Sequence, residues 1–248
     1  MRLFGLIGKT LSHSFSQAYF EEKFRREGIN DATYSLFELA DISLVPALIR
    51  EQPNLIGFNV TIPYKQQIIP FLDELSEEAS AVGAVNTVVI QRTDNHIYTT
   101  GHNTDIIGFQ QSLQGIEIPD RVLVLGTGGA AAAVTYVLEK MGCACTAVSR
   151  NPERGLPYSA LTTEIVAQHR LIVNCTPLGT FPNIHEKPDI PYEGISGKHL
   201  LYDLVYNPTE TTFLKEGLSR SARVCNGLQM LHAQAEAAWE IFTYSPVL

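Results

Sequence analysis

The sequence has few cysteines, and their spacing excludes the common cysteine-based metal sites and disulfide frameworks. The 248 residues contain four, Cys143, Cys145, Cys175 and Cys225, with no C-x-x-C pair among them. Each lies in an apolar or turn context, which favours buried free thiols. We therefore expect no metal site and a reducing compartment.

A run of apolar residues that could cross a membrane is also lacking. The longest stretch without a charged residue, Val122–Leu138, contains three glycines, and its helix-forming part is too short to span a bilayer. At the amino terminus, MRLFGLIGKTLSHS has too short an apolar run for a secretory leader and no small-residue cleavage site. These features predict a soluble, cytoplasmic protein with no membrane partner.

Positive charge is in deficit. The sequence has 18 Lys and Arg against 26 Asp and Glu, a net charge of −8. Such a surface repels phosphate backbones and argues against a nucleic-acid partner. A small anionic ligand is not excluded, because a local basic pocket can override the global field. With 45% apolar residues over its length, the chain can form one large domain or two small ones.

What the sequence does contain is an alternation of strand-like and helix-like segments. In the first hundred residues the patterns predict strands at Leu3–Ile7, Tyr34–Phe37, Leu55–Val60, Val85–Gln91 and His96–Thr99, and helices at Ser16–Glu27, Leu44–Arg50, Tyr64–Phe71 and Glu77–Val82. Thr93-Asp94-Asn95 is a predicted hairpin turn between the last two strands. Such alternation predicts βαβ units and a mostly parallel sheet.

The same alternation continues after a predicted domain boundary near Gly101–Asp105. The patterns predict strands at Arg121–Leu125, Cys145–Val148, Leu171–Val173 and Leu200–Leu204, and helices at Ile106–Leu113, from the glycine turn to Lys140, and at Leu228–Phe242. Phe181–Lys198 is rich in Pro and Gly and reads as a loop. The fold class is therefore α/β.

A glycine-rich turn follows the most apolar strand. Gly126-Thr127-Gly128-Gly129-Ala130-Ala131 matches G-x-G-x-x-A and opens an alanine-rich helix. The first glycine makes the tight turn, and the second lets backbone N–H groups approach a pyrophosphate. The helix N-terminus adds N–H donors and a partial positive charge. The alternative is a glycine turn without a ligand, but the strand–turn–helix context favours a dinucleotide.

The end of the next strand indicates which dinucleotide. An acidic residue there would bind a ribose 2′-hydroxyl, but this sequence has Ser149-Arg150-Asn151, followed by Arg154. Arginine suits a 2′-phosphate through bidentate and stacking contacts. The alternative is that both arginines are solvated surface charges. Two of them at this position, with no acid, favour NADP over NAD.

A polar cluster marks the strand ends of the first half. Asn59-Val60-Thr61-Ile62-Pro63-Tyr64-Lys65 follows the third strand, at the edge where α/β sheets bind ligands. Asn59 and Thr61 face one way if the chain stays extended, and Lys65 is expected on the next helical turn. The alternative for Lys65 is an ordinary exposed helix lysine.

Serines follow the first strand, where Ser14 and Ser16 could both donate to a carboxylate. The alternative is that one of them only caps the next helix. His13, between Ser12 and Ser14, is not assigned a catalytic role. Asp105 could act as a carboxylate in the site or simply lie in the first turn of a helix, where the dipole favours it.

Eight ordered motifs together resemble the shikimate dehydrogenase family over nearly the whole chain. They are Ser14-Phe15-Ser16, Asn59–Lys65 (NVTIPYK), Gly83–Thr87 (GAVNT), Asn103–Gly108 (NTDIIG), Gly126–Ala130, Asn174–Gly179 (NCTPLG), Tyr202–Leu214 and Gly227–Gln234 (GLQMLHAQ). The sequence departs from the family at Gln17, where a proline is usual, and at Ser149-Arg150-Asn151, where Asn-Arg-Thr is usual. It ends at Leu248, before the family's usual C-terminal helix.

The resemblance implies an NADP-dependent, reversible reduction of 3-dehydroshikimate to shikimate, a step of aromatic amino-acid (chorismate) biosynthesis. It implies an N-terminal mixed-sheet α/β substrate domain, residues 1–103 and 227–248, and a Rossmann-like NADP-binding domain, residues 104–226, with the site in the cleft between them. The partner is a small anionic substrate, and the enzyme would be a monomer or homodimer.

The resemblance also assigns residues by position. Lys65 and Asp105 would form the catalytic pair. Substrate contacts would come from Ser14, Ser16, Asn59, Thr61, Asn86, Tyr206 and Gln234. Cofactor contacts would come from Gly126, Gly128, Gly129, Ala130, Arg150, Arg154, Thr176 and Gly227. Two alternatives stay open: a quinate/shikimate dehydrogenase that uses NAD, and an inactive dinucleotide-sensing regulator, which could have lost the Lys–Asp pair freely.

Overall fold

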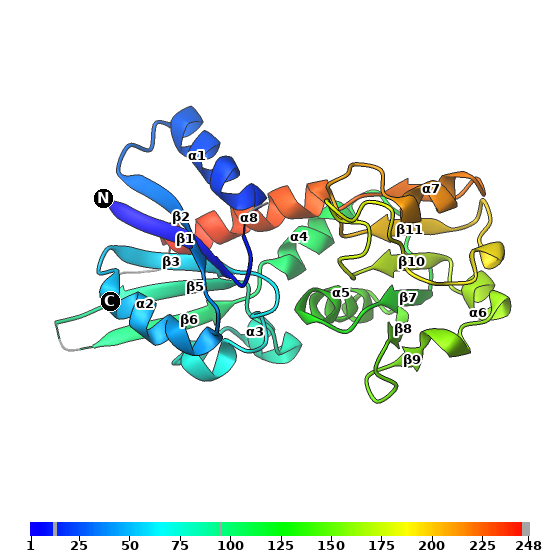
Figure 1. Cartoon of the computed structure of the whole chain (residues 1–248), viewed down its shortest axis with the longest axis horizontal. Coiled ribbons are helices and arrows are strands. Elements are labelled where there is room, and N and C mark those ends of the chain that lie inside the picture. The colour runs from blue at the N-terminus through cyan, green and yellow to red at the C-terminus, as the bar shows by residue number, and fades with distance from the viewer. Residues whose placement is uncertain (12–13, 95, 245–248) are drawn as a thin grey trace. The chain divides into compact units, whose positions relative to one another are not determined.

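The computed structural model describes residues 1–11, 14–94 and 96–244. It divides into two compact units, Met1–Thr104 with Ala235–Leu248, and Asp105–Gln234 (Figure 1). Ser12 and His13, Asn95 of the predicted hairpin turn, and the chain end at Leu248 lie outside the described residues.

The first unit is built on a mixed sheet with strand order β2-β1-β3-β5-β6-β4. The strands are β1 (Arg2–Gly8), β2 (Ala32–Glu38), β3 (Leu55–Val60), β4 (Glu74–Leu75), β5 (Thr87–Arg92) and β6 (Ile97–His102). Strand β1 runs parallel to β2 and β3, whereas β5 runs antiparallel to β3 and β6. The predicted pairing of the last two strands is therefore confirmed.

Helices cover both faces of this sheet. On one face, Phe20 and Phe24 of α1 (Phe15–Glu27) pack with Phe4 of β1 and with Phe242 of α8 (Leu228–Tyr244). Phe20 and Phe24 are four residues apart, so they lie on one face of α1 and are buried together. The other face carries α2 (Val45–Glu51) and α3 (Glu77–Val82) over a core that is mostly aliphatic and includes Phe58 and Tyr64.

The prediction of a helix at Tyr64–Phe71 is wrong. The segment is a run of hydrogen-bonded turns that ends in one 3₁₀ turn, Ile69–Phe71. Pro70 has no N–H to donate to an α-helical ladder. The Lys65 carbonyl oxygen instead accepts the Val85 N–H at 2.7 Å. Lys65 therefore lies on a turn that is fastened to the chain ahead of β5.

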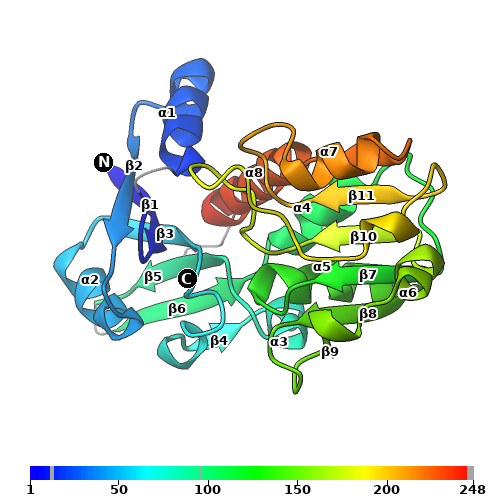
Figure 2. The same ribbon diagram turned by 45° about the vertical axis from the view of Figure 1, so that its right-hand side comes forward.

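The second unit is a doubly wound parallel sheet, which confirms the predicted Rossmann-like fold. Its strand order is β12-β11-β10-β7-β8-β9, and the pairs are parallel. Figure 2 shows β11, β10, β7 and β8 side by side in that order. The strands are β7 (Arg121–Leu125), β8 (Ala144–Ser149), β9 (Leu156–Pro157), β10 (Leu171–Asn174), β11 (Leu200–Asp203) and β12 (Arg223–Cys225).

Four further helices complete this unit: α4 (Asp105–Ser112), α5 (Gly129–Lys140), α6 (Thr163–Gln168) and α7 (Thr212–Leu218). Side chains of α6 and α7 pack on one face of the sheet around Leu123, Ile172 and Leu201. Val122–Leu125 of β7 is fully buried, as expected for a strand covered on both faces. The predicted loop Phe181–Lys198 contains one short 3₁₀ turn, Tyr192–Gly194.

All four cysteines are free thiols, but only Cys143 is buried, so the expectation of burial is wrong for the other three, which are partly exposed. Their surroundings are nonetheless apolar enough that burial raises the pKa of Cys145 to about 11. No helix in the described part of the chain is both long and apolar enough to span a membrane.

Candidate active site

The glycine turn lies where the strand order of the second sheet reverses. Gly126 follows β7, and Thr176 follows the neighbouring strand β10. Gly126 has φ of +110°, a conformation that favours glycine. A Cβ on Gly126 would lie 3.3 Å from the Thr176 methyl group. The two predicted cofactor residues therefore meet at the switch point of a doubly wound sheet, where such folds bind nucleotides.

The amino end of α5 is open toward this point. Gly128 is the N-cap, and no described side chain caps the helix, so its first backbone N–H groups, among them those of Gly129 and Ala130, are available to an anion. A Cβ at Gly128 would meet nothing within 4 Å. The turn thus leaves room for a pyrophosphate beside the backbone, and its donors fit one.

A tight turn after β8 presents the two predicted arginines. The Ser149 hydroxyl accepts the Asn151 N–H at 3.0 Å, and the Asn151 carbonyl accepts the Arg154 N–H at 3.0 Å. Arg150 and Arg154 are exposed, and neither forms an ion pair within the described ranges. Two exposed cations with no carboxylate partner fit a 2′-phosphate.

In the first unit, the buried phenol of Tyr34 joins two predicted substrate residues. It donates to Asn59 Oδ1 at 2.8 Å. Burial raises the pKa of Tyr34, and a hydrogen bond with the Ser16 side chain opposes that rise. The Tyr34 ring stacks on Phe20 with centroids 4.5 Å apart, which fixes the phenol. Ser16 and Asn59, far apart in sequence, are thus brought to one place.

The network continues through the GAVNT motif. The Asn59 amide donates to the Asn86 carbonyl at 3.2 Å and to Thr87 Oγ1 at 3.1 Å. Asn86 Oδ1 in turn accepts the backbone N–H of Thr104 at 2.7 Å and its hydroxyl at 3.2 Å. Asn59, Asn86, Thr87 and Thr104 are buried. These bonds fix the backbone immediately before Asp105.

The remaining residues predicted in the first unit surround this network. Thr61 donates its N–H to the Ile7 carbonyl at 2.9 Å, which places it beside the end of β1. Ser14 is the N-cap of α1, and its hydroxyl accepts the Ser16 N–H at 3.2 Å. Ser14 therefore does cap the helix, and its O–H remains able to donate. Lys65 is half-buried on its turn.

In the second unit, Asp105 and Gln234 lie on adjoining helices. Asp105 is buried at the first turn of α4, and Gly108 follows three residues later, on the same side of the helix. A Cβ on Gly108 would lie 2.6 Å from the Met230 carbonyl oxygen and 2.9 Å from Gln234 Cβ. The glycine therefore allows α8 to approach α4 at the turn that carries Asp105.

Gly227 is hydrogen-bonded to the segment that follows β11, and that segment also carries Tyr206. The Gly227 N–H donates to the Val205 carbonyl at 3.2 Å. A Cβ on Gly227 would overlap the Leu204 carbonyl carbon at 2.6 Å, so this approach requires glycine. Tyr206 is half-buried. The Phe181 N–H, in the loop after β10, donates to the Asn207 carbonyl at 3.0 Å, so the loops after β10 and β11 and the start of α8 form one assembly.

Sequence reasoning missed two buried residues, Tyr34 and Asp203. Tyr34 resembles an ordinary core aromatic in sequence. Asp203 lies within the quoted Tyr202–Leu214 motif, and an acid in a buried strand was the signal that could have revealed it.

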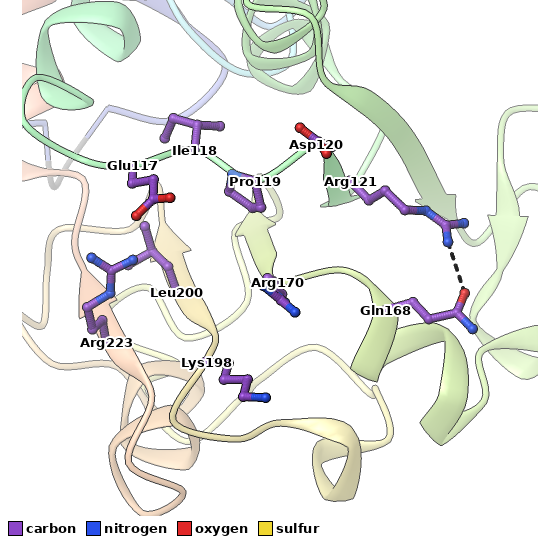
Figure 3. Close-up of a pocket in the computed structure, with 10 residues that line it drawn as sticks. All are labelled: Glu117, Ile118, Pro119, Asp120, Arg121, Gln168, Arg170, Lys198, Leu200 and Arg223. Atoms are coloured by element: carbon purple, nitrogen blue, oxygen red, sulfur yellow. Dashed lines mark hydrogen bonds between the residues drawn. The ribbon is translucent and has the colours of Figure 1, made fainter.

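A hollow of about 490 Å³ lies at the opposite edge of the second sheet. Figure 3 shows its lining, in which Arg121 points toward Gln168. Arg121, Arg170 and Arg223 lie at or just before the amino ends of β7, β10 and β12, near helix C-termini whose dipoles favour cations. None of the predicted site residues lines this hollow. Within the described residues, no three His, Cys, Asp or Glu side chains gather as metal ligands.

Comparisons with known proteins agree with this geometry. A family model described as the shikimate dehydrogenase substrate binding domain matches residues 6–88. A Methanococcus maripaludis protein named shikimate dehydrogenase (NADP(+)) is 36% identical over 262 residues, covering 98% of this chain and 91% of the relative.

Solved structures are similar over the whole chain. Shikimate 5-dehydrogenase of Thermus thermophilus, in complex with NADP(H) and shikimate, has a TM-score of 0.84 at 30% identity and covers 100% of this chain and 95% of its own. A quinate dehydrogenase of Corynebacterium glutamicum, in complex with NAD, also has a TM-score of 0.84 at 30% identity, covering 98% and 93%.

Proposed function

This chain belongs to the shikimate dehydrogenase family, and from that premise we propose that it catalyses the reversible, NADP-dependent reduction of 3-dehydroshikimate to shikimate. The observation that carries the proposal is the dinucleotide cradle that ends in two exposed arginines and no carboxylate. The uncapped end of α5 fits the pyrophosphate, and Arg150 and Arg154 fit the 2′-phosphate. The enzyme is an oxidoreductase of chorismate biosynthesis.

In this proposal each unit has its own task. The first unit, with its Ser16–Tyr34–Asn59 network, is the substrate domain, and the second is the cofactor domain. The carboxylate and hydroxyls of the substrate are held by Ser14, Ser16, Asn59, Thr61, Asn86, Tyr206 and Gln234. The protein acts in the cytoplasm as a monomer or homodimer, without nucleic acid as a partner.

Lys65 and Asp105 are the proposed catalytic residues. NADPH, when bound, supplies the hydride that the C3 carbonyl carbon receives. The Lys65 ammonium stabilises the negative charge that develops on the carbonyl oxygen and donates the proton that completes the C3 hydroxyl. In the reverse direction the neutral Lys65 amine accepts that proton. Asp105 orients the ammonium and accepts a hydrogen bond from the neighbouring substrate hydroxyl.

A second candidate, an NAD-dependent quinate/shikimate dehydrogenase, is favoured by the likeness to the quinate dehydrogenase structure. The exposed pair Arg150 and Arg154 argues against it, because NAD has no 2′-phosphate. The inactive-regulator alternative conflicts with the presence of both Lys65 and Asp105 and their whole polar surroundings.

Initial rates test these candidates together. The purified chain is assayed with shikimate or quinate, each with NADP⁺ or NAD⁺, by the absorbance of the reduced nicotinamide. We expect kcat/KM to be highest for shikimate with NADP⁺, with NAD⁺ weaker by ~10–100-fold through the lost charged hydrogen bonds. A preference for quinate with NAD⁺ supports the second candidate, and no turnover of any pair supports the regulator.

A further inference from the structure

Asp203, the last residue of β11, is a completely buried carboxylate at the centre of the loop assembly of the second unit. Its charged oxygens are expensive to remove from water unless donors surround them. Three donors do so. Oδ1 accepts the Asn174 amide at 2.9 Å and the Val205 N–H at 3.0 Å, and Oδ2 accepts the Thr211 hydroxyl at 2.5 Å.

One branch leads from this carboxylate to the glycine turn. Asn174 Oδ1 accepts both the N–H of Thr176, at 3.0 Å, and its hydroxyl, at 2.6 Å. A side-chain amide fits either way round unless its partners decide. Because a carboxylate only accepts, Asp203 draws the NH₂ of Asn174 toward itself and turns the amide oxygen toward Thr176. Thr176 is thereby held against Gly126.

A second branch of hydrogen bonds leads toward Tyr206, a proposed substrate-binding residue. The N–H of Val205 is held by Asp203 Oδ1, and the Val205 carbonyl accepts the Gly227 N–H at 3.2 Å. Tyr206 follows Val205 directly. Asp203 Oδ1 therefore fixes the peptide that precedes Tyr206. Through Val205 it also fixes the turn at Gly227, where α8 begins.

The third branch, through Thr211, leads to none of the predicted site residues. Thr211 is the N-cap of α7, where its hydroxyl accepts the Leu214 N–H at 3.3 Å. Helix α7 packs into the core of the unit and carries none of the predicted site residues. This branch supports the fold alone, and it therefore provides an internal control.

We propose that Asp203 is a positioning residue of the enzyme: its carboxylate orients Asn174 and the Val205 peptide so that Thr176 and Gly227 contact NADP and Tyr206 contacts the substrate. This inference rests on the proposed function for the roles of those three residues. Asp203 itself touches neither ligand.

The test compares Asp203→Ala, Asp203→Asn and Thr211→Val with the unsubstituted protein. Asp203→Ala leaves Asn174 without its orienting partner, and we expect the dissociation constant and the KM of NADP⁺ to rise ~10–100-fold, the cost of a misplaced binding group. Asp203→Asn keeps one oxygen for Asn174 and Val205 and turns its NH₂ to Thr211, so both constants should stay within about threefold. Thr211→Val should lower the melting temperature and leave both constants unchanged.

Two outcomes overturn the inference: an NADP⁺ dissociation constant for Asp203→Ala within twofold of the unsubstituted protein, or an equal loss in Thr211→Val at equal loss of stability. Should Asp203→Ala not fold, Asn174→Ala cuts the branch to Thr176 alone and is subject to the same criterion. Because NADP⁺ binding is measured directly, by titration calorimetry, the inference is decided even if shikimate is not turned over.

Discussion

The side-chain oxygen of Asn86 accepts the backbone N–H of Thr104 at 2.7 Å, in a place from which water is excluded. This bond ties the GAVNT motif to the peptide that leads into Asp105. Two of the eight motifs are thus joined by a bond that fixes where α4 begins. The Asn86 side-chain oxygen therefore has a structural role in addition to the proposed contact with the substrate.

Replacing Asn86 with alanine should therefore lower both stability and activity. The Thr104 N–H would be left buried without its acceptor, at a cost of about 1–3 kcal/mol in unfolding free energy. The backbone that precedes Asp105 would also no longer be held in one position. We expect kcat/KM for shikimate to fall at least ~10-fold. Thr99→Val, which removes partly buried bonds to Asp73 at 2.8 and 3.1 Å, is the control and should reduce stability without that loss of activity.

Replacing Lys65 with alanine should lower kcat by at least ~100-fold with a smaller change in KM, because it removes the proton-transfer group. Steady-state rates with shikimate and NADP⁺ measure this. Lys9→Ala, which removes an exposed lysine of the same unit, should leave kcat unchanged. A Lys65→Ala enzyme that retained more than half of the original kcat would defeat the assignment.

Replacing Arg150 with alanine should raise the KM of NADPH ~10–100-fold and change that of NADH little, because only NADPH carries the 2′-phosphate. Arg121→Ala, an exposed arginine at the opposite edge of the sheet, should alter neither. Equal effects of Arg150→Ala on both cofactors would remove the argument for a 2′-phosphate contact.

Replacing Tyr34 with phenylalanine should raise the KM of shikimate about threefold to tenfold, the value of one hydrogen bond, with kcat changed less than twofold. Asn59 would lose its donor and Ser16 its partner, whereas the stacking on Phe20 would remain. The KM of NADP⁺ serves as the internal reference and should not move. Tyr98→Phe, which removes a surface phenol bonded to Glu74, should have no effect on either KM.

Asp203 should make the stability of the protein depend on pH. Burial raises its pKa from an ordinary 3.8 to about 6, against the opposing bonds from Thr211, Val205 and Asn174. The native state therefore holds this proton more tightly than the unfolded chain, and the resulting stabilisation is complete below 3.8 and lost as pH rises through 6. The difference corresponds to about 3 kcal/mol.

Urea unfolding at pH 4 and pH 7.5 measures this effect by comparison with Asp203→Asn, which does not titrate. The unfolding free energy of the unsubstituted protein, relative to the variant, should fall by about 2 kcal/mol between the two pH values, because at pH 4 the carboxyl of the unfolded chain is already partly ionised. A difference that stays constant with pH would show that the carboxyl group titrates normally.

Local sequence patterns are enough to predict most of the helices and strands. The strands Leu55–Val60 and Arg121–Leu125 and the helix Glu77–Val82 are predicted to the residue, because each is a clear run bounded by capping or turn residues. The elements β4, β9, β12, α6 and α7 were missed; the three strands among them have only two or three residues, too few to show an alternation. The segment Tyr64–Phe71 has helical spacing, but the tertiary bond from Val85 to Lys65 decides its conformation.

The residues of the candidate site also differ in whether the sequence alone could predict them. The glycine turn is recognisable because the chemistry that it serves is contained in six consecutive residues. The partners of Tyr34 and Asp203, Asn59 and Asn174, are 25 and 29 residues away, so the sequence marks Asp203 only as an acid in an apolar strand and does not show what it binds. Nothing in the neighbouring sequence distinguishes a phenol or a carboxylate with such a partner from one without.

The arginines proposed to bind the 2′-phosphate, Arg150 and Arg154, lie on an exposed turn beyond β8 and are not packed into the core of the sheet. Selection can therefore exchange one nicotinamide nucleotide for the other through a few surface codons, without first compensating a loss of folding energy. Members of this family can therefore change between NAD and NADP while the residues that bind the substrate stay the same.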